Sequence, residues 1–215
     1  MAERPVFISA EQRPFGRAQT VEFTWFAGLS KAQKQRSLAS LHESFLRKFP
    51  DRRVLEISGK STQPLGVALS AFNLKWRRPE GEFTVENLYQ AGKVFSGGGP
   101  YTDLLTVSPR DAKRDERLKT SGRLTGFRMG EESFPLVPAS LFYNWLYLNA
   151  LHSQPALAAA VMEYDAFTDI EFNPNKSVSC QAQAAAIYVA LARQGLVEEA
   201  LRSRQDFLRV VYGRA

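Results

Sequence analysis

Cysteine and histidine are scarce in this sequence. It holds one cysteine, Cys180, and two histidines among 215 residues. One cysteine excludes an internal disulfide, and so few thiol and imidazole groups argue against a zinc site. Cys180 stands just before an Ala-rich segment, a setting that favours a small buried residue over a reactive nucleophile. We therefore expect neither a metal nor a cofactor.

Long apolar runs are missing as well. No stretch reaches the ~20 residues that cross a bilayer. Residues 1–5 also lack the apolar segment of a secretory signal. Internal repeats and low-complexity tracts are absent. We expect a cytoplasmic protein that makes no membrane contact.

Apolar and basic residues are well represented. Hydrophobic residues make up 44% and aromatic residues 12% of the chain, as in a folded globular protein. The net charge of +6 is uneven, because residues 1–128 hold 22 Lys and Arg against 13 Asp and Glu, whereas residues 129–215 hold 6 against 9. A basic surface attracts a phosphate backbone, although many basic proteins bind no polyanion.

The hydrophobic pattern predicts an α+β fold, predominantly α-helical, in a single domain over residues 1–215. Residues 1–22 read as an N-terminal extended segment, and strands are predicted at 21–26 and 52–58. Ser30 is predicted to cap a helix, and so is Ser108, which Pro109 follows at the first helical position. The predicted helices cover 31–49, a segment from 109, two stretches within 139–163, and 181–215, where helices interrupted near Gly195 close the domain.

The segment Val85–Lys93 reads Val-Glu-Asn-Leu-Tyr-Gln-Ala-Gly-Lys. As a helix it would stack Glu86, Gln90 and Lys93 on one face, at i, i+4 and i+7. A carboxylate, an amide and an ammonium on one wall suit acid–base chemistry and a polar ligand. The alternative is a solvated helix face whose Glu and Lys are too far apart to pair.

Two glycine-containing loops are candidates for phosphate contact. Gly59-Lys60-Ser61 follows a predicted strand, but the Walker pattern needs a further glycine where Val54 stands. Its backbone N–H groups and Lys60 could still bind a phosphate, or Lys60 could be a solvated loop residue. The loop Gly97–Pro100 permits close approach to a ligand or merely ends the preceding helix.

Two further features have a functional and an ordinary interpretation. The helix from Pro109 carries Arg110, Lys113 and Arg114 among acidic residues, a mixture that favours a solvated face over DNA contact. Trp145 lies in an apolar helix, where it is either core or a surface that stacks on a flat ring.

Three segments occur in an order that resembles the NADAR family, also called YbiA-like. They are Leu69-Ser70-Ala71-Phe72, Val85–Lys93, and the Ser-Pro-x-x-Ala pattern of Ser108–Ala112. Two positions depart from the family pattern, since Ala71 replaces an Asn and Asn87 replaces a His. Asn73 is a candidate substitute for the missing Asn. The resemblance implies a YbiA-like fold.

Three other segments are similar to the NADAR branch associated with DarT-type toxins: Ser58–Ser61, Tyr101–Leu105 and Tyr164–Pro174. Those toxins attach ADP-ribose to DNA bases. The resemblance implies an antitoxin that removes ADP-ribose from guanine in DNA, or in RNA. Its partners would be ADP-ribosylated DNA, ADP-ribose as product, and a DarT-type toxin.

Cleavage of an N-glycosidic bond develops positive charge on the ribose, which a carboxylate can stabilise. Glu86 is the first candidate and Asp169 the second, with Glu171 as the alternative to Asp169. Lys93 would bind ligand phosphate or hydroxyls, or act as an amine nucleophile. The candidate substrate-binding residues are Ser58, Lys60, Ser61, Phe72, Asn73, Gln90, Gly98, Tyr101 and Trp145.

Two other functions stay open at this point. One is an N-glycosidase that acts on a small phosphorylated metabolite. The other is an antitoxin without catalytic activity that binds ADP-ribose, nucleic acid or the toxin itself.

Overall fold

The N-terminal strands belong to a sheet that also takes in a strand from far along the chain. The structure, a computed structural model, describes residues 1–175 and 177–214. Within them, β1 (Ala2–Ser9) and β2 (Gly16–Phe23) form an antiparallel hairpin. β9 (Ala166–Thr168) lies between β1 and β3 (Val54–Glu56), antiparallel to β1 and parallel to β3. The parallel pair brings the residues after β3 and after β9 to the same edge of the sheet.

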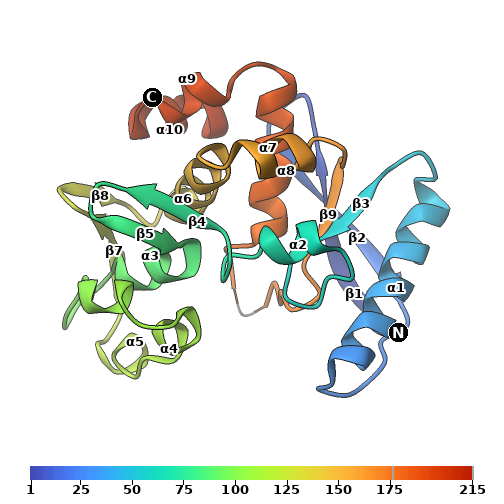
Figure 1. The fold of residues 1–215 in the computed structure, drawn as a ribbon, viewed down its shortest axis with the longest axis horizontal. Coiled ribbons are helices and arrows are strands. Elements are labelled where there is room, and N and C mark those ends of the chain that lie inside the picture. Colours follow the sequence, from blue (N-terminus) through green and yellow to red (C-terminus); the bar gives the residue numbers. More distant parts are fainter. Residues whose placement is uncertain (176, 215) are drawn as a thin grey trace.

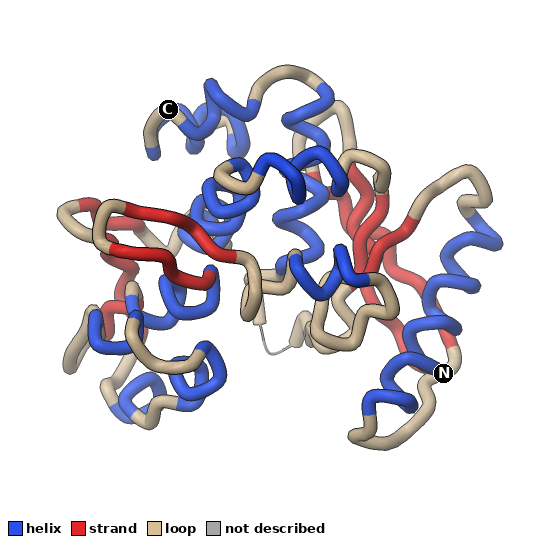
Figure 2. The backbone as a smooth tube through the Cα atoms, in the orientation of Figure 1, coloured by secondary structure: helices blue, strands red, loops and turns tan. Residues whose placement is uncertain are grey.

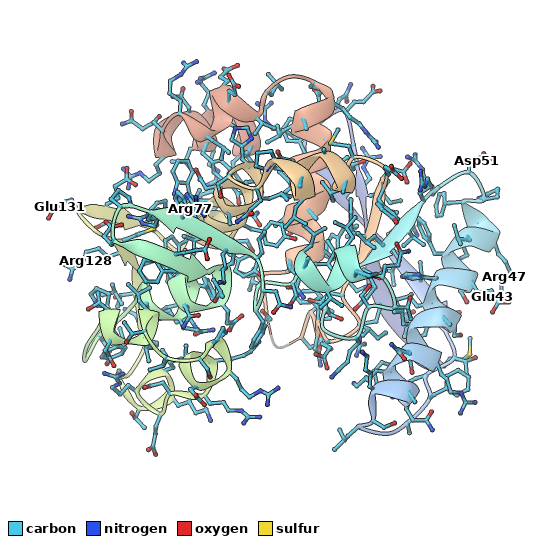
Figure 3. The ribbon with its side chains drawn as sticks, viewed as in Figure 1. Glu43, Arg47, Asp51, Arg77, Arg128 and Glu131 are labelled. Carbon is cyan, nitrogen blue, oxygen red and sulfur yellow. The ribbon has the colours of Figure 1, made fainter. Side chains whose placement is uncertain are left out.

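Helix α1 (Lys31–Lys48) covers one face of this sheet (Figure 1). The Ser30 side chain caps it by accepting from the Gln33 backbone N–H at 3.2 Å. Its apolar side packs on Val6, Val21 and Phe23, while Glu43 and Arg47 project from the outer side (Figure 3). The buried residues that α1 contributes are Leu38, Leu41 and Phe45.

The other face of the sheet packs on α8 (Gln181–Arg193), and α8 packs in turn on α6 (Leu141–His152). α6 is apolar on nearly every side, as expected of a helix surrounded by protein. Figure 2 shows the central helices between the large sheet and the smaller sheets. The shorter helices packed around them are α2 (Pro64–Ala68), α7 (Pro155–Val161), α9 (Val197–Leu201) and α10 (Arg204–Tyr212).

The remaining elements form a lobe beside α6. Helix α3 (Val85–Ala91) packs on the 3₁₀ helix η1 (Thr102–Leu105) and on α4 (Pro109–Arg114), and α5 (Arg117–Thr120) follows α4. Figure 1 shows α3, α4 and α5 grouped together. The strands of this lobe are β4 (Lys75–Arg78) with β5 (Gly81–Thr84), and β6 (Lys93–Phe95) with β7 (Leu124–Met129) and β8 (Glu132–Phe134).

The α+β class is confirmed, although the chain holds more strand than expected. Residues 1–22 form long paired strands, and the antiparallel pair of β7 and β8 was not predicted. Both predicted serine caps are confirmed, because Ser108 also accepts from the Asp111 backbone N–H at 3.2 Å. None of the helices in the described residues is long and apolar enough to cross a membrane.

One predicted helix is shorter than expected. Gly92 ends α3, and Lys93 starts β6 by pairing with Phe127. A Cβ at position 92 would overlap the Phe142 ring, so a glycine is needed where α3 meets α6. The prediction that Lys93 lies on the helix with Glu86 was therefore wrong.

Candidate functional site

A cavity of about 1170 Å³ lies between α3, α4, the loop after β3 and the segment that joins β9 to α8. Its volume exceeds the ~300–1,000 Å³ of an ordinary small-molecule pocket. Three acidic residues line it: Glu86, Asp169 and Glu171. Among the described residues, the basic ones of the lining are Lys60, Lys93, Arg110, Lys113, Arg114 and Lys119.

Glu86 lies in the first turn of α3, where the helix dipole favours a carboxylate. Its side chain is buried, and its Oε1 accepts from Gln90 Nε2 at 2.7 Å. The Lys113 Nζ lies 3.7 Å from the same oxygen. The Glu86 backbone N–H donates to the Ala71 carbonyl at 2.9 Å, which connects α3 to the loop carrying Phe72. The carboxylate is thus fixed in the cavity wall with two donors on one oxygen.

Lys93 reaches the same cavity from β6. Its Nζ lies 5.0 Å from the centre of the Tyr89 ring. Burial lowers the pKa of the Lys93 ammonium, the Glu86 carboxylate opposes this, and the Lys113 ammonium adds to it. Desolvation of this kind makes a lysine amine more available for proton exchange or nucleophilic attack.

Asp169 follows β9 directly and lines the cavity. Its Oδ1 accepts from the backbone N–H groups of Glu171, at 3.0 Å, and Phe172, at 3.2 Å. Its Oδ2 accepts from Gln181 Nε2 at 3.0 Å. Burial, followed by the negative charge of Glu56, raises the pKa of Asp169 to about 7. A carboxyl group with this pKa exchanges a proton near neutral pH.

Gln181 has its orientation imposed by two backbone groups. Its Oε1 accepts from the Ala71 N–H at 2.8 Å, and its Nε2 donates to the Ile57 carbonyl at 2.6 Å. The amide cannot be reversed without losing both bonds, so its Nε2 must face Asp169. Gln181 was not predicted as a site residue. The one signal in the sequence is its place at the start of α8.

Glu56 lies next to Asp169 but does not line the cavity, and it was not predicted as a site residue either. It is buried and accepts from Ser58 Oγ at 2.6 Å and from Thr168 Oγ1 at 2.7 Å. The Ile170 N–H also donates to it, at 3.0 Å. Burial raises the pKa of Glu56, and these three hydrogen bonds oppose that rise. Glu56 therefore joins the loop after β3 to the loop after β9.

Several predicted binding residues do meet at the cavity. The Phe72 ring lies 4.9 Å from Lys113 Nζ, and Asn73 Nδ2 donates to the Val67 carbonyl at 2.8 Å. Ser58 Oγ, besides donating to Glu56, accepts from the Lys60 N–H at 3.0 Å. The predicted residues that line the cavity are Ser58, Lys60, Phe72, Asn73, Glu86, Gln90, Lys93, Asp169 and Glu171.

Four predicted residues do not line the cavity: Ser61, Gly98, Tyr101 and Trp145. Ser61 is buried in the turn after β3, where its Oγ accepts from the Gln63 N–H at 3.2 Å. Tyr101 contacts the Ser121 hydroxyl, and Gly98 packs on Tyr101. Trp145 packs in the core against Phe207, 5.4 Å away between ring centres. The aromatic residues of the cavity are instead Phe72, Tyr89, Phe127, Phe142, Tyr143 and Phe172.

The sequence matches one protein family over almost its whole length. The family described as DarT1-associated NADAR antitoxin matches residues 2–215. The chain belongs to this family. No curated protein matches the sequence significantly.

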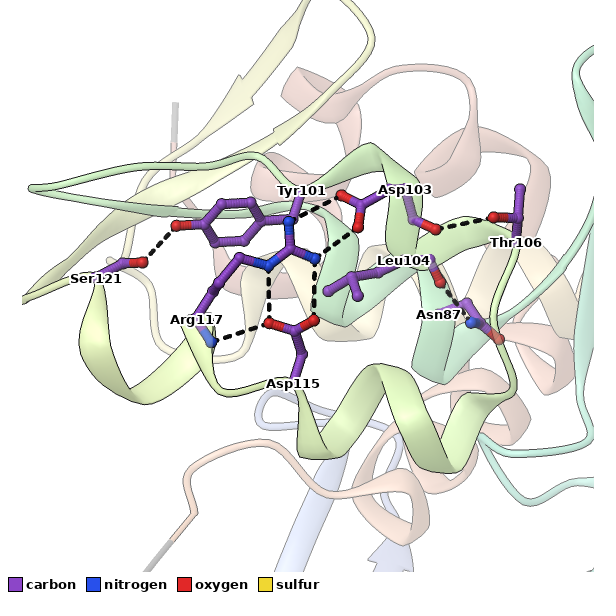
Figure 4. A network of polar contacts seen from close by, with 8 residues as sticks. All are labelled: Asn87, Tyr101, Asp103, Leu104, Thr106, Asp115, Arg117 and Ser121. Carbon is purple, nitrogen blue, oxygen red and sulfur yellow. Dashed lines mark hydrogen bonds and ion pairs between the residues drawn. The ribbon is translucent and has the colours of Figure 1, made fainter.

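The two departures from the NADAR pattern both have structural explanations. Asn87 points away from the cavity and donates through Nδ2 to the carbonyls of Leu104, at 2.7 Å, and Val107, at 3.0 Å (Figure 4 shows the Leu104 contact). It therefore holds α3 against the segment that leads to α4. Ala71 is buried, and its backbone N–H donates to Gln181. Neither side chain offers a polar group to a ligand in the cavity.

Metal-binding potential is low in the part of the chain that the structure describes. There, no three His, Cys, Asp or Glu side chains gather closely enough to hold a metal ion. Cys180 is buried, and burial raises the pKa of its thiol well above the ordinary value. A thiol of this kind is a poor nucleophile at neutral pH.

Proposed function

We propose that this NADAR-family antitoxin is an ADP-ribosylguanine glycohydrolase. It would hydrolyse the N-glycosidic bond between ADP-ribose and a guanine base of DNA, or of RNA, and so reverse the modification made by a DarT-type toxin. The observation that carries the proposal is the meeting of Glu86, Lys93 and Asp169 at one large cavity. Family membership supports the pairing with a DarT-type toxin.

Asp169 has the properties of the general acid. Its carboxyl group accepts three hydrogen bonds, two at Oδ1 and one at Oδ2. The second lone pair of Oδ2 is the one left to hold a proton. With a pKa of about 7, this carboxyl group can give that proton to the guanine nitrogen as the C–N bond breaks.

Glu86 has the properties of the charge-stabilising group. As the C–N bond breaks, positive charge develops on the ribose ring, and a fixed carboxylate lowers the energy of that state. Gln90 and Lys113 hold one of its oxygens. The other oxygen can orient a water molecule, whose hydroxyl adds to the ribose carbon while its proton passes to a carboxylate. The products are ADP-ribose and unmodified guanine.

Lys93 has two possible roles in this reaction. As an ammonium it would bind phosphate or ribose hydroxyls, as Lys60 would from the loop after β3. As a desolvated amine it would attack the ribose carbon itself, and water would then release the sugar from the lysine. The lowered pKa of Lys93 makes loss of its proton easier, which favours the amine role.

The test is a comparison of the wild-type protein with Glu86→Gln on an oligonucleotide that carries one ADP-ribosylated guanine. Gln keeps the shape and an acceptor oxygen for Gln90, but it removes the negative charge. The matched control is Glu43→Gln, because Glu43 is exposed on the outer side of α1 (Figure 3). Mass spectrometry follows the loss of ADP-ribose, and fluorescence anisotropy follows binding of the modified oligonucleotide.

We expect wild type and Glu43→Gln to restore plain DNA at equal rates. Glu86→Gln should be about 10²–10⁴-fold slower while it still binds the substrate. If wild type leaves modified DNA intact, the proposal is wrong. Inhibition of the toxin by an inert protein would then favour the non-catalytic antitoxin, and cleavage of a small phosphorylated N-glycoside would favour the metabolite enzyme.

A further inference from the structure

The wall of the cavity formed by α4 and α5 carries three cations without an acidic partner. Arg110 and Arg114 lie one turn apart on the same side of α4, and Lys119 lies on α5. All three are exposed and line the cavity. Within the described residues, none of the three makes an ion pair, whereas their neighbours Lys113 and Arg117 do.

Arg117 shows how this wall is held in place. Its guanidinium binds Asp115 and Asp103, with the closest contacts at 2.9 and 2.6 Å (Figure 4). It also lies 4.4 Å from the centre of the Tyr101 ring. Because Arg117 pairs with one carboxylate in η1 and one in the turn that joins α4 to α5, it links these two segments. The three unpaired cations are therefore presented on a fixed support.

We propose that Arg110, Arg114 and Lys119 bind backbone phosphates of the DNA strand on either side of the modified guanine. This inference rests on the proposed function and adds to it the binding site of the nucleic-acid strand. Unpaired basic side chains on one wall bind a polyanion without reading its sequence.

A count of charges favours strand phosphates over the pyrophosphate of ADP-ribose. The pyrophosphate brings two negative charges, and Lys60 and Lys93 are available for it on other walls of the cavity. Lys113 lies against Glu86. The three cations of α4 and α5 thus remain in excess of what ADP-ribose needs. A DNA strand supplies one further charge with each nucleotide.

The experiment uses two substrates, one with and one without a nucleic-acid strand on either side of the modified guanine. One is a single-stranded oligonucleotide with a central ADP-ribosylated guanine, and the other is ADP-ribosylated guanosine. The test variant combines Arg110→Gln, Arg114→Gln and Lys119→Gln. The matched control removes three other exposed cations by Arg17→Gln, Lys48→Gln and Arg202→Gln. Within the residues that the structure describes, these three make no ion pair and do not line the cavity.

For the test variant, we expect kcat/KM on the oligonucleotide to fall roughly 10- to 100-fold at low salt, with the guanosine substrate changed less than about twofold. The slope of log(kcat/KM) against log(salt) should become shallower by about 2, since each phosphate contact on a single strand contributes about 0.7. The control variant should behave as wild type does on both substrates.

Three results would overturn the inference: an equal fall on both substrates, no fall on the oligonucleotide, or an equal fall in the control variant. If wild type cleaves neither substrate, the proposed function fails, and the inference is decided by anisotropy with an unmodified fluorescent oligonucleotide. Weaker binding by the test variant alone would then uphold the strand site, and equal binding by all three proteins would refute it.

Discussion

Gln181 is the residue whose removal tests the architecture of the site most directly. Its side chain is 9% exposed and makes three hydrogen bonds, to Ala71, Ile57 and Asp169. Gln181→Ala would leave the Ala71 N–H and the Ile57 carbonyl without partners, and Asp169 would lose the donor on Oδ2.

The size of the effect follows from those losses. A buried backbone group without a partner costs about 1–3 kcal/mol, and water entering the space left by Ala would recover part of that cost. We therefore expect Gln181→Ala to lower the free energy of unfolding by about 2–4 kcal/mol. For a chain of this length, each kcal/mol shifts Tm by about 2–4 °C, so Tm should fall by about 5–15 °C.

The assay is equilibrium unfolding in urea, followed by tryptophan fluorescence. Gln194→Ala is the matched control, because Gln194 stands at the other end of α8 and is exposed, and its side chain donates to the Ala190 carbonyl. The control should change the free energy of unfolding by less than about 0.5 kcal/mol. If Gln181→Ala is no less stable than Gln194→Ala, the three hydrogen bonds do not hold the site together.

Two further predictions concern stability. The folded state keeps a proton on Asp169 up to about pH 7, whereas the unfolded chain releases it near pH 4, so this group makes stability fall as pH rises between those values. The measurement is the urea midpoint of each protein at pH 5 and at pH 7.5. The change in midpoint from pH 5 to pH 7.5 should be more positive in Asp169→Asn than in wild type. An equal change in both proteins would refute the raised pKa. Gly66→Ala should destabilise the fold by about 3 kcal/mol or more, because the new Cβ would overlap the Glu56 carbonyl and the Ser61 side chain. A Cβ at Gly59 would meet no atom within 4 Å, so Gly59→Ala should leave the stability unchanged. Thermal unfolding compares the two variants.

Local sequence patterns predicted one part of the site well. Glu86 and Gln90 do share a helix face, because both lie within α3 and depend on helical periodicity alone. Lys93 lies one residue beyond the glycine that ends α3, so helical periodicity wrongly placed it in α3, whereas it begins β6. Its side chain still lines the cavity, since β6 runs along the same wall.

The rest of the site depends on pairing between distant segments. Asp169 and Glu56 are neighbours because β9 lies parallel to β3, and a pairing over that separation leaves no periodic signal in the sequence. Trp145 could not be assigned for a different reason. Because α6 is apolar on nearly all sides, its pattern does not say which aromatic residues face the cavity.

The hydrogen bonds around Glu56 oppose the rise in its pKa that burial causes. The Thr168 hydroxyl lies within hydrogen-bond distance of Glu56 Oε2, at 2.7 Å, and of His42 Nε2, at 2.8 Å. Burial lowers the pKa of His42 to about 4, which favours the neutral ring. Glu56 then accepts from Ser58, Thr168 and Ile170, an arrangement that favours its charged form.

Burial and the negative charge of Glu56 both disfavour the charged form of Asp169, and together they raise the pKa of Asp169 to about 7. Asp169 is the member of the pair that lines the cavity, and Gln181 keeps its second oxygen turned to a fixed donor. In the proposed reaction, the same buried network that joins β3, β9 and α8 supplies an acidic proton at the cavity wall near neutral pH. In this protein, the contacts that hold the sheet edge together and the contacts that prepare the proposed general acid are the same contacts.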